Sequence, residues 1–285
     1  MRFSVNSELE YNLNSPATFL FALRCLETGD QTIISESLVT TPEVNIEEFH
    51  IISGMNRFSR IRTRNPGSIS ISYRAEIELS TKRVDVSSLI GGGTAELNPE
   101  GIPFLFPSRY CQSDRLRRQA NAMFGHLTSP HSIASCVSDW IYENIAYVSG
   151  SSDETSSAVD TLEQRQGVCR DFAHLGIAMC RALNVPARYA TVYAYQLCPQ
   201  DFHACFEIFI GGWWYLFDPT RLAPLNGFVR IATGRDAADA AVCTIFGDPQ
   251  LTRSTVSCEL EQSQTSFTPV TRDSLVNSGQ AIALL

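Results

Sequence analysis

The sequence predicts a β-sandwich followed by a second region in which helices and strands are mixed. Three observations lead to this prediction. Short runs with period-two alternation fill the first hundred residues, a glycine-rich segment interrupts them at residues 91–103, and helix-period apolar stripes begin only after that segment. Strands and helices that occupy successive parts of a chain are typical of the α+β class.

The clearest strand of the first region is expected from Ile69 to Leu79. Every second residue of this run is apolar, from Ile69 through Tyr73 to Leu79, and the intervening residues are polar. Strict alternation indicates a sheet with one buried and one solvated face. A second strand is expected from Thr18 to Leu26, and turn signals such as Asn65-Pro66-Gly67 separate the runs. Several short strands without a strong helix favour a β-sandwich.

The segment 91–103 reads as a linker, and helices are predicted beyond it. Ser129 and Pro130 form a helix start, with an N-cap residue followed by proline at the first helical position. A second helix is expected from about Val168 to Leu183. The predicted division is therefore a sandwich at 1–100, a second domain at 101–262 and a polar tail at 263–285, ordered at best in part.

The composition restricts the class of protein. The 285 residues carry a formal net charge of −8, which disfavours nucleic acid as a partner. No apolar run is long enough for a membrane span, and the N-terminus lacks the apolar core of a signal peptide, so we expect a soluble, cytoplasmic protein. Nine cysteines without a CxxC pair predict reduced thiols and disfavour a closed zinc site. We expect no metal and no cofactor. A homo-oligomer is left open.

A β-hairpin is predicted over residues 201–220. Gly211-Gly212 separates two strand-like runs, so Ile210 pairs with Trp213. The same register places Asp218 diagonally across from His203, within side-chain reach. One face of the hairpin is apolar and must be core. The other carries His203, Asp218 and most of the remaining ionisable groups, so we expect it to face a cleft or another element.

Cys169 directly follows Gly167-Val168 at the predicted start of a helix. One interpretation is a small buried apolar residue, and the alternative is a nucleophile whose thiolate the helix N-terminus favours. Taken without Cys169, His203 and Asp218 are more readily interpreted as a structural pair on the sheet surface. If the helix start lies against the hairpin, the three side chains can form a nucleophile, base and orienting carboxylate. His174 lies about 140° around the helix from Cys169 and is expected to be structural.

Three motifs, "GVCRDFAHLGIAMCRALNVPARY", "DFHACFEIF" and "WYLFDPTRLAP", closely resemble the bacterial branch of the transglutaminase-like superfamily. The resemblance spans residues 108–247, and the first hundred residues also resemble the N-terminal region of that family. It implies a papain-like α+β core with Cys169 as nucleophile, His203 as base and Asp218 as third member. Two residues depart from the family pattern: Arg170 stands where glutamine is frequent, and Cys205 stands where tryptophan is frequent. Both could alter the substrate pocket.

The implied reaction is acyl transfer from a peptide or carboxamide bond of a peptide or protein substrate through a thioester. If water accepts the acyl group, the protein is a cysteine protease or amidase, which we favour. If an amine accepts it, the protein is a transglutaminase. A non-catalytic peptide-binding module stays open. The Cys169 backbone N–H is one expected oxyanion donor, and Gln112 and Tyr147 are candidates for the second. Arg170 and Trp214 are candidate substrate contacts, and Arg235, Asp236 and Asp239 either line the cleft or, in the case of Asp236, cap a short helix.

Overall fold

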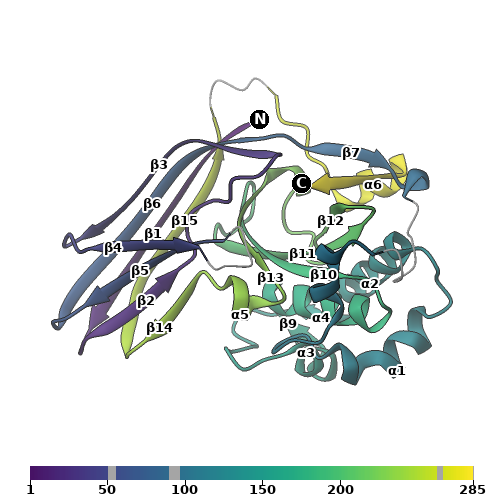
Figure 1. The fold of residues 1–285 in the computed structure, drawn as a ribbon, viewed down its shortest axis with the longest axis horizontal. Helices are drawn as coiled ribbons and strands as arrows, with labels where there is room; N and C mark the ends of the chain where they lie inside the picture. Colours follow the sequence, from purple (N-terminus) through teal and green to yellow (C-terminus); the bar gives the residue numbers. More distant parts are fainter. Residues whose placement is uncertain (51–55, 90–96, 262–265, 285) are drawn as a thin grey trace.

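The computed structural model describes residues 1–50, 56–89, 97–261 and 266–284 (Figure 1). Two four-stranded antiparallel sheets form the sandwich. The first contains, in spatial order, β15 (Pro249–Leu260), β1 (Arg2–Leu13), β6 (Gly67–Leu79) and β3 (Gln31–Thr41), and the second contains β14 (Cys243–Phe246), β2 (Ala17–Phe21), β5 (Arg57–Thr63) and β4 (Ile46–His50). The predicted sandwich is confirmed.

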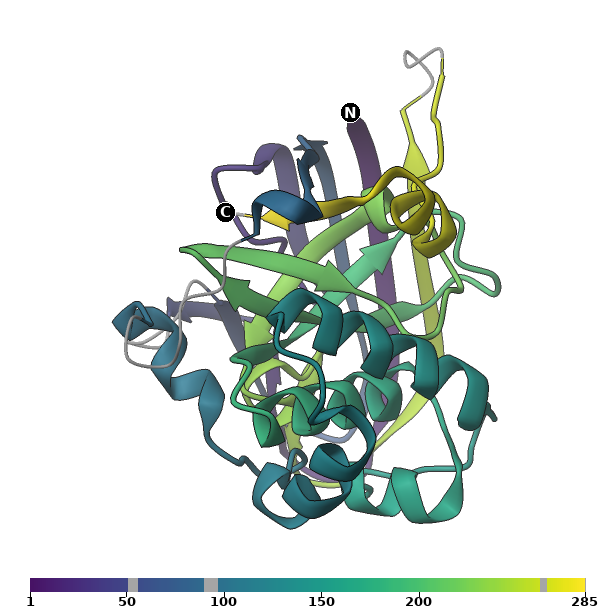
Figure 2. The ribbon, with the colours of Figure 1, turned by 90° about the vertical axis from the view of Figure 1, so that its right-hand side faces the viewer.

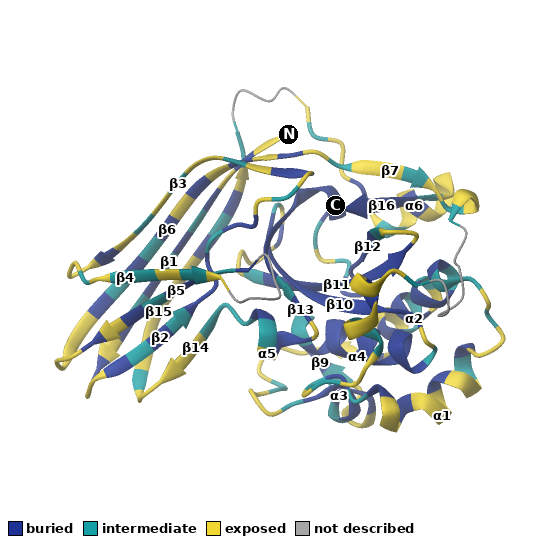
Figure 3. Cartoon of the chain, viewed as in Figure 1, coloured by how far each residue is buried: buried dark blue, intermediate teal, exposed yellow. Residues whose placement is uncertain are grey.

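The alternating pattern at 69–79 sets the packing of the first sheet. β6 lies between β1 and β3, and its apolar residues are buried while most of the intervening ones are exposed or half-buried (Figure 3). The other predicted strand is shorter than expected, because β2 ends at Phe21. The following residues leave the sheet and turn inward, where the Leu26 N–H donates to the carbonyl of Arg230 at 2.9 Å.

Strands from the far end of the sequence complete both sandwich sheets. β15 pairs with β1 along its length, and β14 pairs with β2. The range 101–262 thus supplies two strands to the sandwich, in addition to its own sheet. The division of the chain at residue 100 stays a prediction. Of the predicted linker, residues 91–96 lie outside the described residues, and Pro99–Leu105 form a 3₁₀ helix.

The third sheet has six strands and carries the predicted hairpin. Its order is β13 (Phe228–Gly234), β10 (Ala187–Ala194), β11 (Phe202–Ile210), β12 (Trp213–Phe217), β16 (Gln280–Leu284) and β7 (Lys82–Asp85). The ladder pairs Ile210 with Trp213 and Phe206 with Phe217, which confirms the predicted register. A short parallel pair joins β8 (Ala146–Tyr147) to β9 (Gln166–Gly167).

Helices cover one face of this sheet (Figure 2). They are α1 (Ser113–Phe124), α2 (Pro130–Asn144), α3 (Ala158–Gln164) and α4 (Cys169–Ala182), with the single turn α5 (Ala237–Ala240) beside β13. α4 packs directly on β10 and β11 with the other three around it. A side-chain carbon at Gly176 would lie 2.6 Å from the Phe206 ring, so glycine allows this close approach. None of the described helices is long and apolar enough to cross a bilayer.

The prediction that the tail is ordered at best in part is wrong for residues 266–284. They form α6 (Arg272–Ser278) and β16, which pairs with both β12 and β7. Leu275 and Ile282 are buried, and Arg272 donates to both carboxylate oxygens of Asp139 on α2, at 3.0 and 2.8 Å. The segment is polar in composition, but most of its apolar residues are buried, among them Val270, Leu275 and Ile282.

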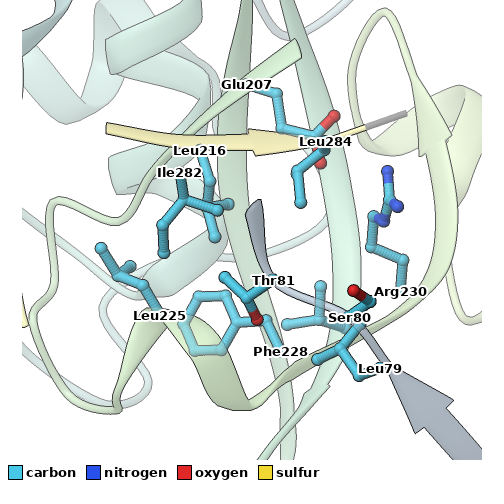
Figure 4. A pocket seen from close by; sticks show the side chains of 11 residues that line it. Leu79, Ser80, Thr81, Glu207, Leu216, Leu225, Phe228, Arg230, Ile282 and Leu284 are labelled. Atoms are coloured by element: carbon cyan, nitrogen blue, oxygen red, sulfur yellow. The ribbon is translucent and has the colours of Figure 1, made fainter. Parts of the chain in front are cut away.

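The second face of the hairpin differs from expectation. Cys205 and Trp214 pack in an apolar cluster that also contains residues of β16 and α6, so most of this face is core. Its buried charge is paired: Arg188 Nε donates to Glu207 Oε2 at 2.6 Å, and the guanidinium lies 3.9 Å from the centre of the Trp214 ring. Glu207 also borders a small cavity together with Arg230 and apolar side chains (Figure 4).

Candidate active site

The start of α4 is fixed by two residues that flank Cys169. The Asp171 carboxylate accepts a hydrogen bond from the Val168 N–H at 2.8 Å, and it is fully buried. A side-chain carbon at Gly167 would lie 2.6 Å from the Asp171 Cβ, so only glycine permits this cap. Since the helix begins at Cys169, the thiol lies in the first turn, where unpaired N–H groups favour an anion.

A loop before α3 is tied to this helix start. The Ser152 hydroxyl donates to Asp171 Oδ2 at 2.5 Å, and the Arg170 guanidinium donates to the Asp153 carbonyl. Arg170 is half-buried and borders the cleft described below, and its contact with a substrate stays a prediction. Its side chain is held along one wall of that cleft.

His203 and Asp218 form a buried pair at the end of the hairpin. His203 Nε2 lies 2.9 Å from Asp218 Oδ2, and both side chains are almost inaccessible to solvent. Because Nε2 is engaged with the carboxylate, Nδ1 is the ring nitrogen left for the thiol. The diagonal contact expected from the hairpin register is therefore present.

Thr220 completes the surroundings of the carboxylate. Its hydroxyl lies 2.8 Å from Asp218 Oδ1 and 3.0 Å from Oδ2, and its N–H donates to Oδ1 at 2.9 Å. Sequence reasoning did not single out this residue. The signal was available, since a threonine two residues after an aspartate in Asp-Pro-Thr is typical of a side-chain-to-backbone turn.

The pKa of His203 reflects both burial and its partners. Burial disfavours the charged ring, but the charge of Asp218, the hydrogen bond to it and a hydrogen bond with Cys169 together raise the pKa of His203 to about 10. His203 is therefore an imidazolium at neutral pH. An imidazolium beside a cysteine is the arrangement that favours a thiolate.

A cleft of about 1030 Å³ gives access to this centre. Cys169 and His203 lie along it, with Tyr189 and Thr191 of β10. The opposite wall is a continuous segment from α5 to the start of β15, residues 237–249. Sequence analysis did not predict this wall, since nothing local links the segment to the cysteine.

Tyr147 is the candidate oxyanion donor that the structure brings to Cys169. The β8–β9 pairing places it opposite Gly167, and the Val148 N–H donates to the Gly167 carbonyl at 2.9 Å. Burial and the nearby charge of Cys169 raise the pKa of Tyr147 to about 12, while a hydrogen bond from the Cys169 backbone lowers it. The Tyr147 hydroxyl therefore lies next to Cys169.

Two other candidates lie elsewhere. Trp214 is buried in the second apolar cluster against Phe104 and Phe209 and does not border the cleft, because these apolar side chains cover it. Gln112 is the residue before α1; its Oε1 is buried without a partner among the described residues, and it does not border the cleft.

The remaining polar residues of this region are structural. Asp236 caps α5 by accepting from the Ala238 N–H at 2.9 Å and also accepts from the Tyr110 N–H at 2.9 Å, and Arg235 pairs with Asp239. None of the three acidic or basic residues predicted for the GRDAAD segment borders the cleft. His174 is fully buried, stacks on Tyr110 and accepts from the Ala237 N–H, so it cannot act as the base.

Comparisons with known proteins cover both halves of the chain. Residues 117–219 match the model of the transglutaminase-like superfamily, and residues 1–92 match the bacterial transglutaminase N-terminal domain. A crystal structure from Cytophaga hutchinsonii, described as a "putative cysteine protease", is 48% identical and superposes with a TM-score of 0.94 over 100% of this chain and 98% of its own. An uncharacterized protein of Mycobacterium leprae, ML0607, is 30% identical over 121 residues, which are 39% of this chain and 43% of that protein. The match thus spans less than half of that relative.

Proposed function

Because the chain belongs to the transglutaminase-like superfamily, we propose that it cleaves peptide or carboxamide bonds by acyl transfer to the thiol of Cys169 and then to water. The observation that supports this proposal is the buried His203–Asp218 pair, because His203 borders the same cleft as Cys169. A purely structural ion pair needs neither a neighbouring thiol nor access to a cleft.

In the first step the Cys169 thiolate attacks the carbonyl carbon and forms a C–S bond. The C–N bond then breaks, and the His203 imidazolium gives its proton to the leaving amine. In the second step water attacks the thioester, His203 accepts the proton from the water, and the thiolate leaves. Asp218 keeps the ring oriented through Nε2 and stabilises its charged form.

The negative charge that develops on the carbonyl oxygen needs donors in both steps. We assign this role to the backbone N–H of Cys169, in the first turn of α4, and to the hydroxyl of Tyr147. The two groups are neighbours, since Cys169 is among the groups that shift the pKa of Tyr147. The tyrosine hydroxyl can swing from the N–H to the substrate oxygen when a carbonyl enters.

Selective alkylation tests whether Cys169 is the nucleophile. Cys136 and Cys198 are exposed, whereas Cys169 is half-buried, so labelling controlled by accessibility alone modifies Cys136 and Cys198 first. We expect iodoacetamide at neutral pH to modify Cys169 first, because the imidazolium favours its thiolate. Cys136→Ala serves as the matched control and should leave the rate at Cys169 unchanged. Slower labelling of Cys169 than of the exposed thiols contradicts the proposal.

Turnover distinguishes the two acyl acceptors. The protein is incubated with a peptide library with and without an added primary amine, and products are identified by mass. Hydrolysis adds the mass of water and continues unchanged when the amine is present; transamidation adds the amine. Cys169→Ala should fold normally and give no product, and turnover that survives this change excludes the mechanism.

A further inference from the structure

β14 forms one edge of its sheet and lies beside α5 (Figure 1). Within the described residues it pairs with β2 alone, and the register places Cys243 opposite Phe21, Thr244 opposite Leu20 and Ile245 opposite Phe19. An edge strand carries a row of backbone donors and acceptors along its unpaired side.

The hydrogen bonds to β2 determine which peptide groups point outward. The Ala22 N–H donates to the Val242 carbonyl at 2.9 Å, and the same register places these two residues opposite each other. In an antiparallel ladder, opposite pairs alternate between bonded and non-bonded. Thr244 therefore turns its peptide groups to β2, whereas Cys243 and Ile245 turn theirs away.

This outward side faces the candidate active site. Cys243, Thr244 and Ile245 all border the cleft that contains Cys169 and His203. Successive side chains of a strand point to opposite faces, so three consecutive residues can border one cleft only along the strand's edge. The N–H and C=O groups of Cys243 and Ile245 thus point into the cleft, and no described residue bonds to them.

We propose that an extended segment of a polypeptide substrate binds in the cleft as an added strand on β14, paired with the backbone of Cys243 and Ile245. The inference rests on the proposed function and adds the class of substrate: an unfolded or flexible segment, since the added strand has to enter the cleft to reach both β14 and Cys169. The adjoining part of the same wall is formed by alanines of the 237–241 segment, whose small side chains leave room for a main chain. Ile245, 38% exposed, offers an apolar contact beside the edge.

The test removes one outward donor while keeping the ladder to β2. Ile245→Pro deletes an N–H that points into the cleft, and proline is tolerated in an edge strand at such a position. Ile245→Val is the matched control and retains the donor. Two probes are used: fluorescein-labelled β-casein, a flexible polypeptide, and p-nitrophenyl acetate, which requires the thiol but is too small to reach β14.

We expect Ile245→Pro to lower kcat/KM for casein about fivefold to tenfold, as the loss of one hydrogen bond implies, and to leave the rate with p-nitrophenyl acetate unchanged. Ile245→Val should match the wild type with both. Equal casein turnover by Ile245→Pro and wild type overturns the inference. Wild-type turnover of the ester without turnover of casein also overturns it, but leaves acyl transfer by Cys169 intact. Failure with both probes is instead a failure of the proposed function and removes the basis of the inference.

Hydrogen exchange provides a second measurement that does not depend on the proline variant. It uses Cys169→Ala with and without excess casein. Pairing of a substrate strand should slow exchange of the Cys243 and Ile245 amides, while the Thr244 amide, already bonded to β2, should not change. The absence of slowing at Cys243 and Ile245, with casein that the wild type cleaves, overturns the inference.

Discussion

Asp218→Asn should destabilise the protein by an amount that depends on pH in a defined way. The variant keeps the shape of the side chain but removes the charge that holds the proton on His203. The pKa of His203 is raised from the ordinary 6.5 to about 10. A raised pKa stabilises the folded state fully below about pH 6.5, and this stabilisation is lost as pH rises through 10. The shift corresponds to roughly 5 kcal/mol, similar to the cost of breaking a buried ion pair.

The assay is urea unfolding of wild type and Asp218→Asn at pH 6, 7, 8 and 9. The difference in free energy of unfolding should be largest at pH 6 and should shrink by about 1.4 kcal/mol per pH unit above 7. The reason is that the folded wild type binds one proton more than the unfolded wild type in this range. Asp239→Asn, which breaks the largely exposed pair with Arg235, is the control and should give a difference independent of pH. A constant difference for Asp218→Asn refutes the presence of an imidazolium at neutral pH.

Three further predictions concern single side chains. Tyr147→Phe should lower kcat about 10²-fold with little change in KM, because one oxyanion donor is lost, and steady-state kinetics with an unchanged kcat contradicts the assignment of Tyr147. The pKa of His131 is lowered to about 4 by burial and by Arg272, so stability should be lost as pH falls from 6.5 to 4. Between pH 6.5 and pH 4 the free energy of unfolding of His131→Leu should therefore fall by roughly 3 kcal/mol less than that of the wild type, measured by urea unfolding. Parallel plots of the two free energies against pH argue against a neutral His131. Arg188→Met should cost about 3–5 kcal/mol because it leaves the buried Glu207 carboxylate without its ion-pair partner, and adding Glu207→Leu should recover most of this loss in thermal unfolding. A double variant as unstable as the single one is the contrary result.

The parts of the site that the sequence predicts are those set by local geometry. Gly167 and Asp171 lie within three residues of Cys169, and together they determine where α4 begins. The Gly211-Gly212 turn fixes the hairpin register over its whole length, which places His203 within reach of Asp218. Both relations follow from chain geometry over fewer than twenty residues, so no knowledge of the rest of the fold is needed.

The parts that sequence analysis missed depend on contacts between distant segments. β16 has only five residues and is recognised as a strand only when β12 and β7 flank it. The second hairpin face reads as polar, since the partners that make it core come from η3 (Pro99–Leu105) and from α6. Trp214 lies on that face as expected, but apolar side chains cover it there instead of a cleft. Period-two alternation separates two faces but does not tell which element covers each.

The sandwich contributes directly to the candidate site. The cleft wall includes β14, and β14 is held in place by β2 on one side and by its short connection to β15, which pairs with β1. Tyr193 of β10 adds a direct link, since its hydroxyl donates to the Leu23 carbonyl and lies 3.0 Å from the Ser7 hydroxyl. The cleft has one wall on the sandwich and the other on the region of the six-stranded sheet and α4. Its width therefore depends on how these two regions contact each other. Substitutions at these buried links, far from Cys169, therefore act on substrate binding as well as on stability.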